Sequence, residues 1–478
     1  MLSILILVSV FALYWRILPY PLVQDDWSIV DAVGKFGGLG FLGETFSRLD
    51  YTFYRPLANV YFLLILKLFG MNALGFHVIV LLVHSFNSFL IYRIAMELTS
   101  DKSLGWMSAF LYASAITVHL DTLVWMVGFY DVAGVSFSLL SIIFFLSDRR
   151  FPALLAFCAA LLTKESTVVV PFVLLALSFR TRNEKAVELR QAMKRGIPFI
   201  AVLMLFLAFR YQSIANILKA DSNEYTLQFF GPSLFINLQA YARWISDSLV
   251  PVLMAKRDPW IFLVALGAIL LTYLRQNGSF RMFSMLVVWL CVGIIPALLL
   301  QNHAYRYYLV YSLPAIVLLV SMGIQNLAQV MNIGQRQFAI VAAGLVLTNI
   351  VIAHMYLTNL EGQKLGAPTV DGSNNLLRKG LAVNMTKALL EREGHKLPHG
   401  ATLLFDWVPT VSFGTRIGPG IWCNDTSIVV YEVIRDSTGM HLLDPTRPDL
   451  EPQIPSFDTG VIITCRENEF TFSRLSDF

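Results

Sequence analysis

The sequence predicts an α-helical polytopic membrane protein of about eleven transmembrane helices, followed by a small C-terminal α/β domain. Three observations lead to this fold class. Hydrophobic residues make up 56% of the 478 residues and charged residues only 14%, which is about half the charged fraction of a soluble domain. Several apolar runs approach the length that crosses a bilayer. After about residue 360 the chain changes to short alternating strands separated by charged turns.

Basic residues set the expected orientation in the membrane. They gather in short connections that alternate with acidic and aromatic ones: Arg93, Lys102, Arg149, Arg150, segment 181–196, Arg275, Arg281 and Arg336. The positive-inside rule places these basic connections in the cytoplasm. The first run, about 2–18, then passes outward, and we expect a retained span because a basic n-region and a small-x-small cleavage site are absent. A bacterial inner membrane is the expected location, and the external side is then the periplasm.

The expected spans follow one another along the first three quarters of the chain. They lie at about 2–18, 74–97, 104–118, 130–146, 151–162, 168–179, a run ending near Arg210, 259–274, 282–300, 308–328 and 337–357. The runs at 151–162 and 168–179 are too short to cross ~30 Å at 1.5 Å per residue. Either the bilayer thins there or the TKES tip between them lies below the outer surface. Segment 181–196 is expected to be a cytoplasmic surface helix.

Two long external loops are expected, at 19–72 and 212–258. The first contains YRPLANVYFLLILKLFG, which Arg55, Pro56 and Lys67 interrupt, so we expect an interfacial helix and not a span. The second contains another amphipathic candidate, INLQAYARWISDSLVPVL. The stretch HLDTLVWMVGFYD is expected to be an external turn after the third span.

The expected division is a transmembrane domain over 1–358 and an extracytoplasmic α/β domain over 359–478. Strands are predicted at ATLLFDW, SIVVYEV and GVIITC, with NNLLRKGLAVNMTKALLEREG as a preceding helix. A segment of this size can bury its own core. Cys423 and Cys465 both lie in it, and a disulfide between them is plausible outside the cytoplasm, although the sequence does not fix the distance between their Cα atoms.

The segment QDDW places two adjacent acids, Asp25 and Asp26, directly after the first apolar run. Other polar side chains gather at the same predicted external face. They are Tyr54, Arg55, His119, Asp121, Trp125, Asp131, Lys164, Glu165, Arg210, His303, Arg306 and Tyr307. Ionisable groups near membrane depth are costly, so they are usually paired or functional. A carboxylate can take a proton from a reacting hydroxyl, and cations from separate helices can hold a phosphate.

Each of these residues also has a purely structural interpretation. Adjacent acids before an apolar run can cap a helix, and Lys164 can extend its amine to the interface. Glu165 can be the ion-pair partner of that lysine, and Arg306 can be an interfacial anchor beside tyrosines. His119 and Asp121 could contribute to a divalent metal site, but two residues do not make one, so neither a metal nor another cofactor is predicted.

Five stretches together resemble the GT-C superfamily of integral-membrane glycosyltransferases, in particular its protein O-mannosyltransferase-like and aminoarabinose-transferase-like members. These stretches are QDDW, YRPLANVYFLLILKLFGMNALGFHVIVLLVHSFNSFLIY, VHLDTLVWMVGFYD, LLTKESTVVVPF and HAYRYYLVYSLP. They occur in the family's order and cover about residues 1–330. One departure is Phe129-Tyr130, where many members have a basic residue before the acid at Asp131. The chain beyond 360 matches no pattern that we can name.

The resemblance implies a GT-C fold and a glycosyltransferase that moves one sugar from a polyprenyl-phosphate donor to an extracytoplasmic glycan, lipid or protein. Asp25 or Asp26 would be the general base. Donor phosphate would bind to Lys164, Arg306 and Arg210. The sugar or acceptor pocket would comprise Tyr54, Arg55, His119, Asp121, Trp125, Asp131, Glu165, His303 and Tyr307.

Two other functions remain open from the sequence. The first is a transporter or flippase of a lipid-linked saccharide, which would be expected to show internal repeats and charges near the midplane. We find no such repeat, and the ionisable groups gather on one face, so the enzyme is favoured. The second is an inactive relative that serves as a scaffold, against which the Asp25-Asp26 pair argues. No nucleic-acid partner is expected.

Overall fold

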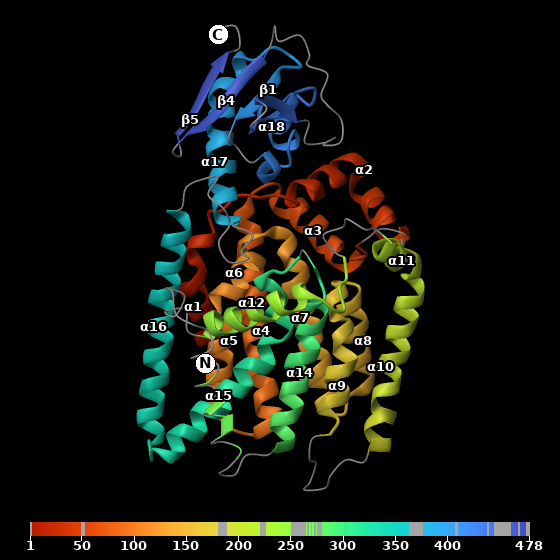
Figure 1. The fold of residues 1–478 in the computed structure, drawn as a ribbon, viewed down its shortest axis with the longest axis vertical. Helices are drawn as coiled ribbons and strands as arrows, with labels where there is room; N and C mark the ends of the chain where they lie inside the picture. Colours follow the sequence, from red (N-terminus) through yellow and green to blue (C-terminus); the bar gives the residue numbers. More distant parts are fainter. Residues whose placement is uncertain are drawn as a thin grey trace.

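The computed structural model describes residues 2–48, 53–179, 189–219, 226–249, 280–301, 303–362, 376–406, 410–436, 439–443, 460–466 and 469–474, with six single positions between 264 and 274. The described chain is a long helical bundle with a small β-sheet region at one end (Figure 1). Two helices that follow the first apolar helix lie between the bundle and this region, as Figure 1 shows.

The bundle contains most of the predicted spans. Its helices are α1 (Leu2–Tyr14), α4 (Ala73–Thr99), α5 (Lys102–Ser114), α7 (Phe129–Leu146), α8 (Arg150–Leu161), α9 (Val170–Leu177), α10 (Leu189–Phe209), α14 (Phe280–Leu298), α15 (Leu313–Val330) and α16 (Gln335–Glu361). By length and composition, five described helices can cross a membrane, or six if one bent pair counts as a single span. The chain is thus an integral multi-pass membrane protein. The span expected at 259–274 falls mostly outside the described residues, as does the start of the expected surface helix at 181–196.

Polar contacts fix where these apolar helices start and how they pack. Asn72 caps α4 by accepting a hydrogen bond from the Leu74 N–H, and Asp101 caps α5 in the same way. Inside the bundle, the Asn87 side chain of α4 donates to the Val132 carbonyl of α7 at 2.9 Å. Hydrogen bonds of this kind hold membrane helices together where both surfaces are apolar. They fix the first turn of α7, which carries Asp131.

The prediction of an external turn at HLDTLVWMVGFYD is wrong for the first half of this stretch, which is helical. Helix α5 ends at Ser114, and after a bend of 56° the chain continues as the buried helix α6 (Ile116–Val124). The bend occurs because Ala115 leaves the helical region at φ −72° and ψ 60°, while the apolar residues of α6 fill the core. A short turn, η2 (Met126–Gly128), then leads into α7.

Both expected loops contain helices. The first holds α2 (Asp26–Ser47), which is kinked at Gly37 (φ 66°), and the expected interfacial helix α3 (Pro56–Phe69). The second holds α11 (Tyr211–Lys219) and the expected amphipathic helix α12 (Pro232–Leu249). Pro56 stands at the first position of α3, where its missing N–H has no partner to lose.

The C-terminal region confirms the predicted α/β pattern. Helix α17 (Leu376–Glu393) precedes a five-stranded sheet of order β3-β2-β1-β4-β5. The predicted strands are β1 (Thr402–Asp406), β2 (Val429–Asp436) and β4 (Gly460–Arg466), with β1 parallel to both others. The sequence analysis missed the antiparallel edge strands β3 (Gly439–Leu443) and β5 (Glu469–Arg474). A short helix, α18 (Ile417–Trp422), follows η7 (Thr410–Phe413).

The disulfide considered for Cys423 and Cys465 is not formed, since Cys423 has a free thiol. Cys423 follows α18, and its sulfur lies 2.9 Å from the point where a Cβ on Gly394 would be. The thiol therefore packs against the turn after α17, whereas Cys465 belongs to strand β4.

Candidate active site

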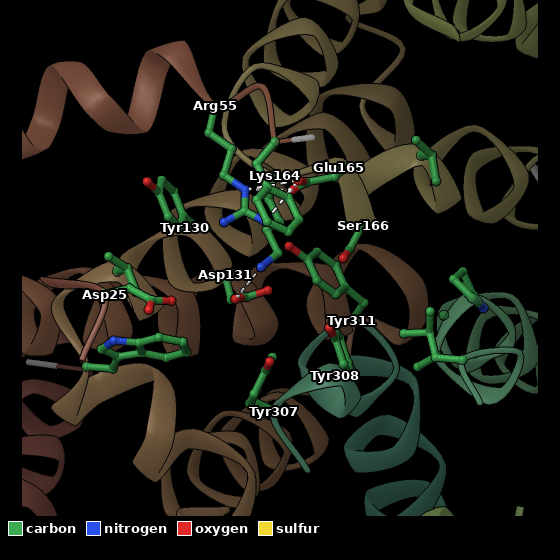
Figure 2. Close-up of a pocket in the computed structure, with 18 of the residues that line it drawn as sticks. Asp25, Arg55, Tyr130, Asp131, Lys164, Glu165, Ser166, Tyr307, Tyr308 and Tyr311 are labelled. Carbon is green, nitrogen blue, oxygen red and sulfur yellow. Dashed lines mark hydrogen bonds and ion pairs between the residues drawn. The ribbon is translucent and has the colours of Figure 1, made fainter. Parts of the chain in front are cut away.

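A cavity of about 540 Å³ lies where the starts of α2 and α7, the tip between α8 and α9, and the end of α14 meet. Figure 2 shows Asp25 on one side of it, three tyrosines on the other, and Lys164 and Asp131 between them. Its lining includes seven of the residues proposed from the sequence: Asp25, Arg55, Trp125, Asp131, Lys164, Glu165 and Tyr307. Residues more than a hundred positions apart in the sequence thus face one volume.

Lys164 lies at the tip between the two short helices and reaches across to α7. Its Nζ donates to Oδ2 of Asp131 at 3.0 Å, and the two side chains are 10% and 4% exposed. Gly134, one turn after Asp131, permits this approach, because a Cβ there would lie 3.1 Å from Cβ of Lys164 and 2.7 Å from the Tyr311 hydroxyl. The spacing of the bundle therefore depends on a residue without a side chain at this point.

Arg55 forms the second ion pair of the cavity. Its guanidinium donates from Nε and Nη2 to both oxygens of Glu165, at 2.8 to 3.1 Å. It also lies 4.4 Å from the ring centroids of Phe53 and Tyr130. Such bidentate, stacked geometry holds an arginine firmly in place. The tip 164–165 is thus bound to both the first loop and α7.

Three buried polar atoms beside the cavity have no hydrogen-bond partner within the described part of the chain. They are the indole N–H of Trp125, Oδ1 of Asp131 and the hydroxyl of Tyr311. All three residues line the cavity. A buried polar group left unsatisfied costs about 1–3 kcal/mol, so these atoms point to a ligand with complementary donors and acceptors.

The two adjacent acids lie in different surroundings. The Asp25 side chain is exposed and lines the cavity. Asp26 is fully buried, and its carboxylate accepts hydrogen bonds from the backbone N–H groups of Val23 (2.9 Å), Met126 (3.3 Å) and Val127 (3.0 Å). Asp26 therefore fastens the first loop to the turn before α7, and Asp25 is the acid that a substrate can reach.

Burial raises the pKa of Asp26 to about 8, while the three backbone N–H groups act to lower it and the neighbouring Asp25 to raise it. Removal from water disfavours the charged form more than these hydrogen bonds favour it. The value places the ionisation of Asp26 near neutral pH.

The other two predicted phosphate-binding residues lie outside the described lining of the cavity. Arg306 begins η5 (Arg306–Tyr311), is 2% exposed, and pairs with Asp247 of α12 at 3.6 Å beside the Trp244 ring. Arg210 donates to the Ser213 hydroxyl at 3.0 Å and lies over the Tyr54 ring. The structure thus groups Lys164 with Arg55, and not with Arg306 and Arg210, at the cavity.

The remaining predicted pocket residues also lie outside this lining. His119 contacts the Tyr112 carbonyl through Nε2 at 3.0 Å and the His84 ring at 4.3 Å, within the bundle. Asp121 lies on the same helix, where its side chain faces α17. The Tyr54 hydroxyl lies near the Phe46 carbonyl. His303 packs edge-on against the Tyr305 ring, with 4.7 Å between their centroids.

The sequence analysis missed five polar residues of the cavity, namely Ser28, Tyr130, Ser166, Tyr308 and Tyr311. The signal was present in two of the quoted stretches, since Tyr130 precedes Asp131 and RYYLVY follows His303. The tyrosines beside Arg306 were read as part of an interfacial anchor, whereas η5 places Tyr308 and Tyr311 at the cavity.

One wall of the cavity is apolar. It is formed by side chains from α2, the turn before α7, η3 (Glu165–Val169), α11, the segment after it and the end of α14: Ile29, Val127, Val168, Ile214, Leu227, Pro296, Ala297 and Leu300. The cavity therefore has a charged, hydrogen-bonding part and a hydrocarbon part.

Two other features of the described residues set this site apart. Among the described residues, no three His, Cys, Asp or Glu side chains are grouped as metal ligands would be. A second cavity of about 500 Å³ lies between the first loop, the start of α4 and α17. Its described lining holds one amine, that of Lys387, and no carboxylate, so it lacks the opposed acid and cation of the first cavity.

No protein-family model matches the sequence. No curated protein matches it either. Among solved structures, the chain is similar to the crystal structure of ArnT from Cupriavidus metallidurans bound to undecaprenyl phosphate, at 13% identity and a TM-score of 0.44. The match covers 89% of this chain and 75% of that one.

Proposed function

We propose that the chain is a membrane glycosyltransferase that moves one sugar from a polyprenyl-phosphate donor to a hydroxyl of an extracytoplasmic glycan, lipid or protein. The observation that carries this proposal is the composition of the first cavity described above. An exposed carboxylate, Asp25, faces two cations, and an apolar wall adjoins them. A ligand that is part sugar phosphate and part hydrocarbon matches both halves.

Two ion pairs hold the cations of the cavity in position. Its described lining holds three carboxylates, Asp25, Asp131 and Glu165, and two cations, Arg55 and Lys164. Asp131 and Glu165 pair with the two cations and so hold them in position before a donor binds. A phosphodiester then adds the oxygen acceptors that the remaining donors of Lys164 can contact.

The reaction that we propose is a displacement at the anomeric carbon of the donor sugar. The acceptor oxygen forms a bond to that carbon, and its proton passes to the Asp25 carboxylate. The bond from the carbon to the phosphate oxygen breaks, and its electron pair leaves with polyprenyl phosphate. The phosphate gains a second negative charge in this step, and Lys164 stabilises that charge. Trp125, Asp131 and Tyr311 supply the hydrogen-bonding atoms that orient the sugar.

Arg306 and Arg210 have supporting roles in this proposal. Arg306 anchors the start of η5, whose tyrosines line the cavity. Arg210 ends the α10 segment next to α11, which contributes Ile214 to the apolar wall. Both arginines act indirectly, because the η5 tyrosines and Ile214, and not the arginines, line the cavity.

The test compares cells that produce the intact chain with cells that produce Asp25→Asn. Mass spectrometry of cell-envelope glycans, lipids and glycoproteins should reveal a species heavier by one sugar in the first cells only. Farnesyl phosphate, a short prenyl phosphate, should quench the tryptophan fluorescence of both purified proteins, and farnesol should do so much more weakly. Equal sugar content in the two kinds of cells would contradict the proposal, and so would equal affinity for phosphate and alcohol.

A further inference from the structure

The first-loop segment Gln24–Trp27, which carries Asp25, is held from two sides. Asp26 binds the turn before α7 on the bundle side. On the other side, the Gln24 N–H donates to the Ser412 carbonyl of the C-terminal region at 2.9 Å. Gln24 has φ 52°, a left-handed conformation that a residue with a side chain adopts only where its surroundings hold it. The backbone before Asp25 is therefore fixed by the C-terminal region.

Trp27, two residues after Asp25, provides the second contact. It is 3% exposed and packs edge-on against Trp422 at the end of α18, with 5.6 Å between ring centroids and 88° between planes. Gly414 lies directly against it, because a Cβ on Gly414 would come within 2.5 Å of the Trp27 Cβ. Gly414 also has φ 64°, so any other residue would be strained there as well as crowded. We call Ser412, Gly414 and Trp422 the clamp.

The clamp is part of the C-terminal hydrophobic core and so moves with it. Phe413, within the clamp sequence, is fully buried and packs between Phe405 of β1 and Trp422, at 5.2 Å and 5.8 Å. Helix α17 approaches the same acid, since the amine of Lys379 interacts electrostatically with Asp25 and Asp121. The C-terminal region thus touches the Asp25 segment through two separate elements.

We propose that the clamp positions Asp25 for the transfer step, which makes the C-terminal region a part of the catalytic apparatus. This inference rests on the proposed function of the cavity. The Asp25 side chain is exposed, and the backbone of Gln24–Trp27 that carries it sets its distance from the reacting hydroxyl. A displacement of about 1 Å at a catalytic group can cost about a hundredfold in rate.

The experiment measures kcat and donor affinity separately in the full purified chain. Trp422→Ala and Gly414→Ala disturb Trp27 in two different ways, the first by removing a contact and the second by adding a clash. We expect kcat to fall about 10- to 100-fold in each, with the affinity for farnesyl phosphate within twofold of the original. Trp422→Phe should restore most of kcat, and Ile421→Ala, an exposed neighbour on the same helix, should leave it unchanged.

A double-mutant cycle shows whether the clamp acts through Asp25. In the Asp25→Asn background, adding Gly414→Ala should lower the residual turnover by less than twofold, since the group that it displaces is already inactive. A kcat within twofold of the original in both clamp variants would overturn the inference, and so would a parallel loss of donor affinity. Full activity in Asp25→Asn alone would instead overturn the proposed function, so the two failures are distinguishable.

Discussion

Two charged clusters of this protein have nearly the same composition and different surroundings. In the cavity, Lys164 pairs with Asp131 beside an open volume. Three buried polar atoms there have no hydrogen-bond partner among the described residues. In the second cluster, Arg306 pairs with Asp247, and the two side chains are 2% and 5% exposed and packed beside Trp244. Composition therefore does not separate a binding site from a structural ion pair. The cavity beside the pair does.

The largest expected effect separates catalysis from stability at the first cluster. Asp25→Asn removes the proton acceptor, and general-base catalysis contributes about 10²–10⁴-fold, so transfer should fall by that factor. Asp25 is exposed, so the thermal unfolding midpoint should stay within about 2 °C of the original. Turnover and thermal unfolding in detergent check both parts. A variant that loses both together would mean that Asp25, like Arg306, is structural.

Arg306→Met should show the opposite pattern. Removing one partner of a buried ion pair leaves Asp247 without its cation and costs about 3–5 kcal/mol. The double variant Arg306→Met with Asp247→Leu should recover most of this loss, because no charge then remains buried. Denaturant unfolding in mixed micelles measures the free energy. If Arg306→Met keeps its stability but loses affinity for farnesyl phosphate, the two clusters share one function and the contrast between them is wrong.

Lys164→Met tests the phosphate contact of the cavity. Hydrogen bonds to charged groups contribute about 1.5–3 kcal/mol, so the affinity for farnesyl phosphate should fall about 10- to 100-fold while that for farnesol is unchanged. Lys387→Met is the matched control, since it removes an amine from the second cavity. Equal losses in the two variants would indicate a general electrostatic attraction and not a specific contact.

The sequence predicts those features that depend on local patterns. Apolar run length located the spans, and alternation located β1, β2 and β4, because both patterns are local. The motif order predicted a shared site for Asp25, Asp131 and Lys164, and the three residues line one cavity. It could not distinguish Arg306 from Arg55, because which one faces the cavity depends on how η5 packs on α12 and how α3 begins. Buried α6 was taken for a turn, since His119 and Asp121 make it look polar.

The smallest expected effect comes from Asp26, the buried neighbour of the reactive acid. An amide has one acceptor oxygen, so in Asp26→Asn at least one of the N–H groups of Val23, Met126 and Val127 loses its partner. We expect a loss of about 1–3 kcal/mol in the free energy of unfolding. Transfer activity should fall less than in Asp25→Asn, because Asp26 only holds the segment in place.

The pH dependence of stability gives this variant its own signature. The pKa of Asp26 is about 8 in the folded protein and about 3.8 ordinarily, so between these values the folded state binds more protons than the unfolded one. The contribution of Asp26 to the free energy of unfolding is therefore complete below pH 4 and falls as pH rises toward 8. When unfolding is measured across this range, that decline should be much smaller in Asp26→Asn and only slightly smaller in Asp25→Asn, because the Asp25 charge is the smallest cause of the raised pKa. If all three proteins show the same decline, Asp26 ionises as an exposed carboxyl does, and the contrast between the two adjacent acids loses its physical basis.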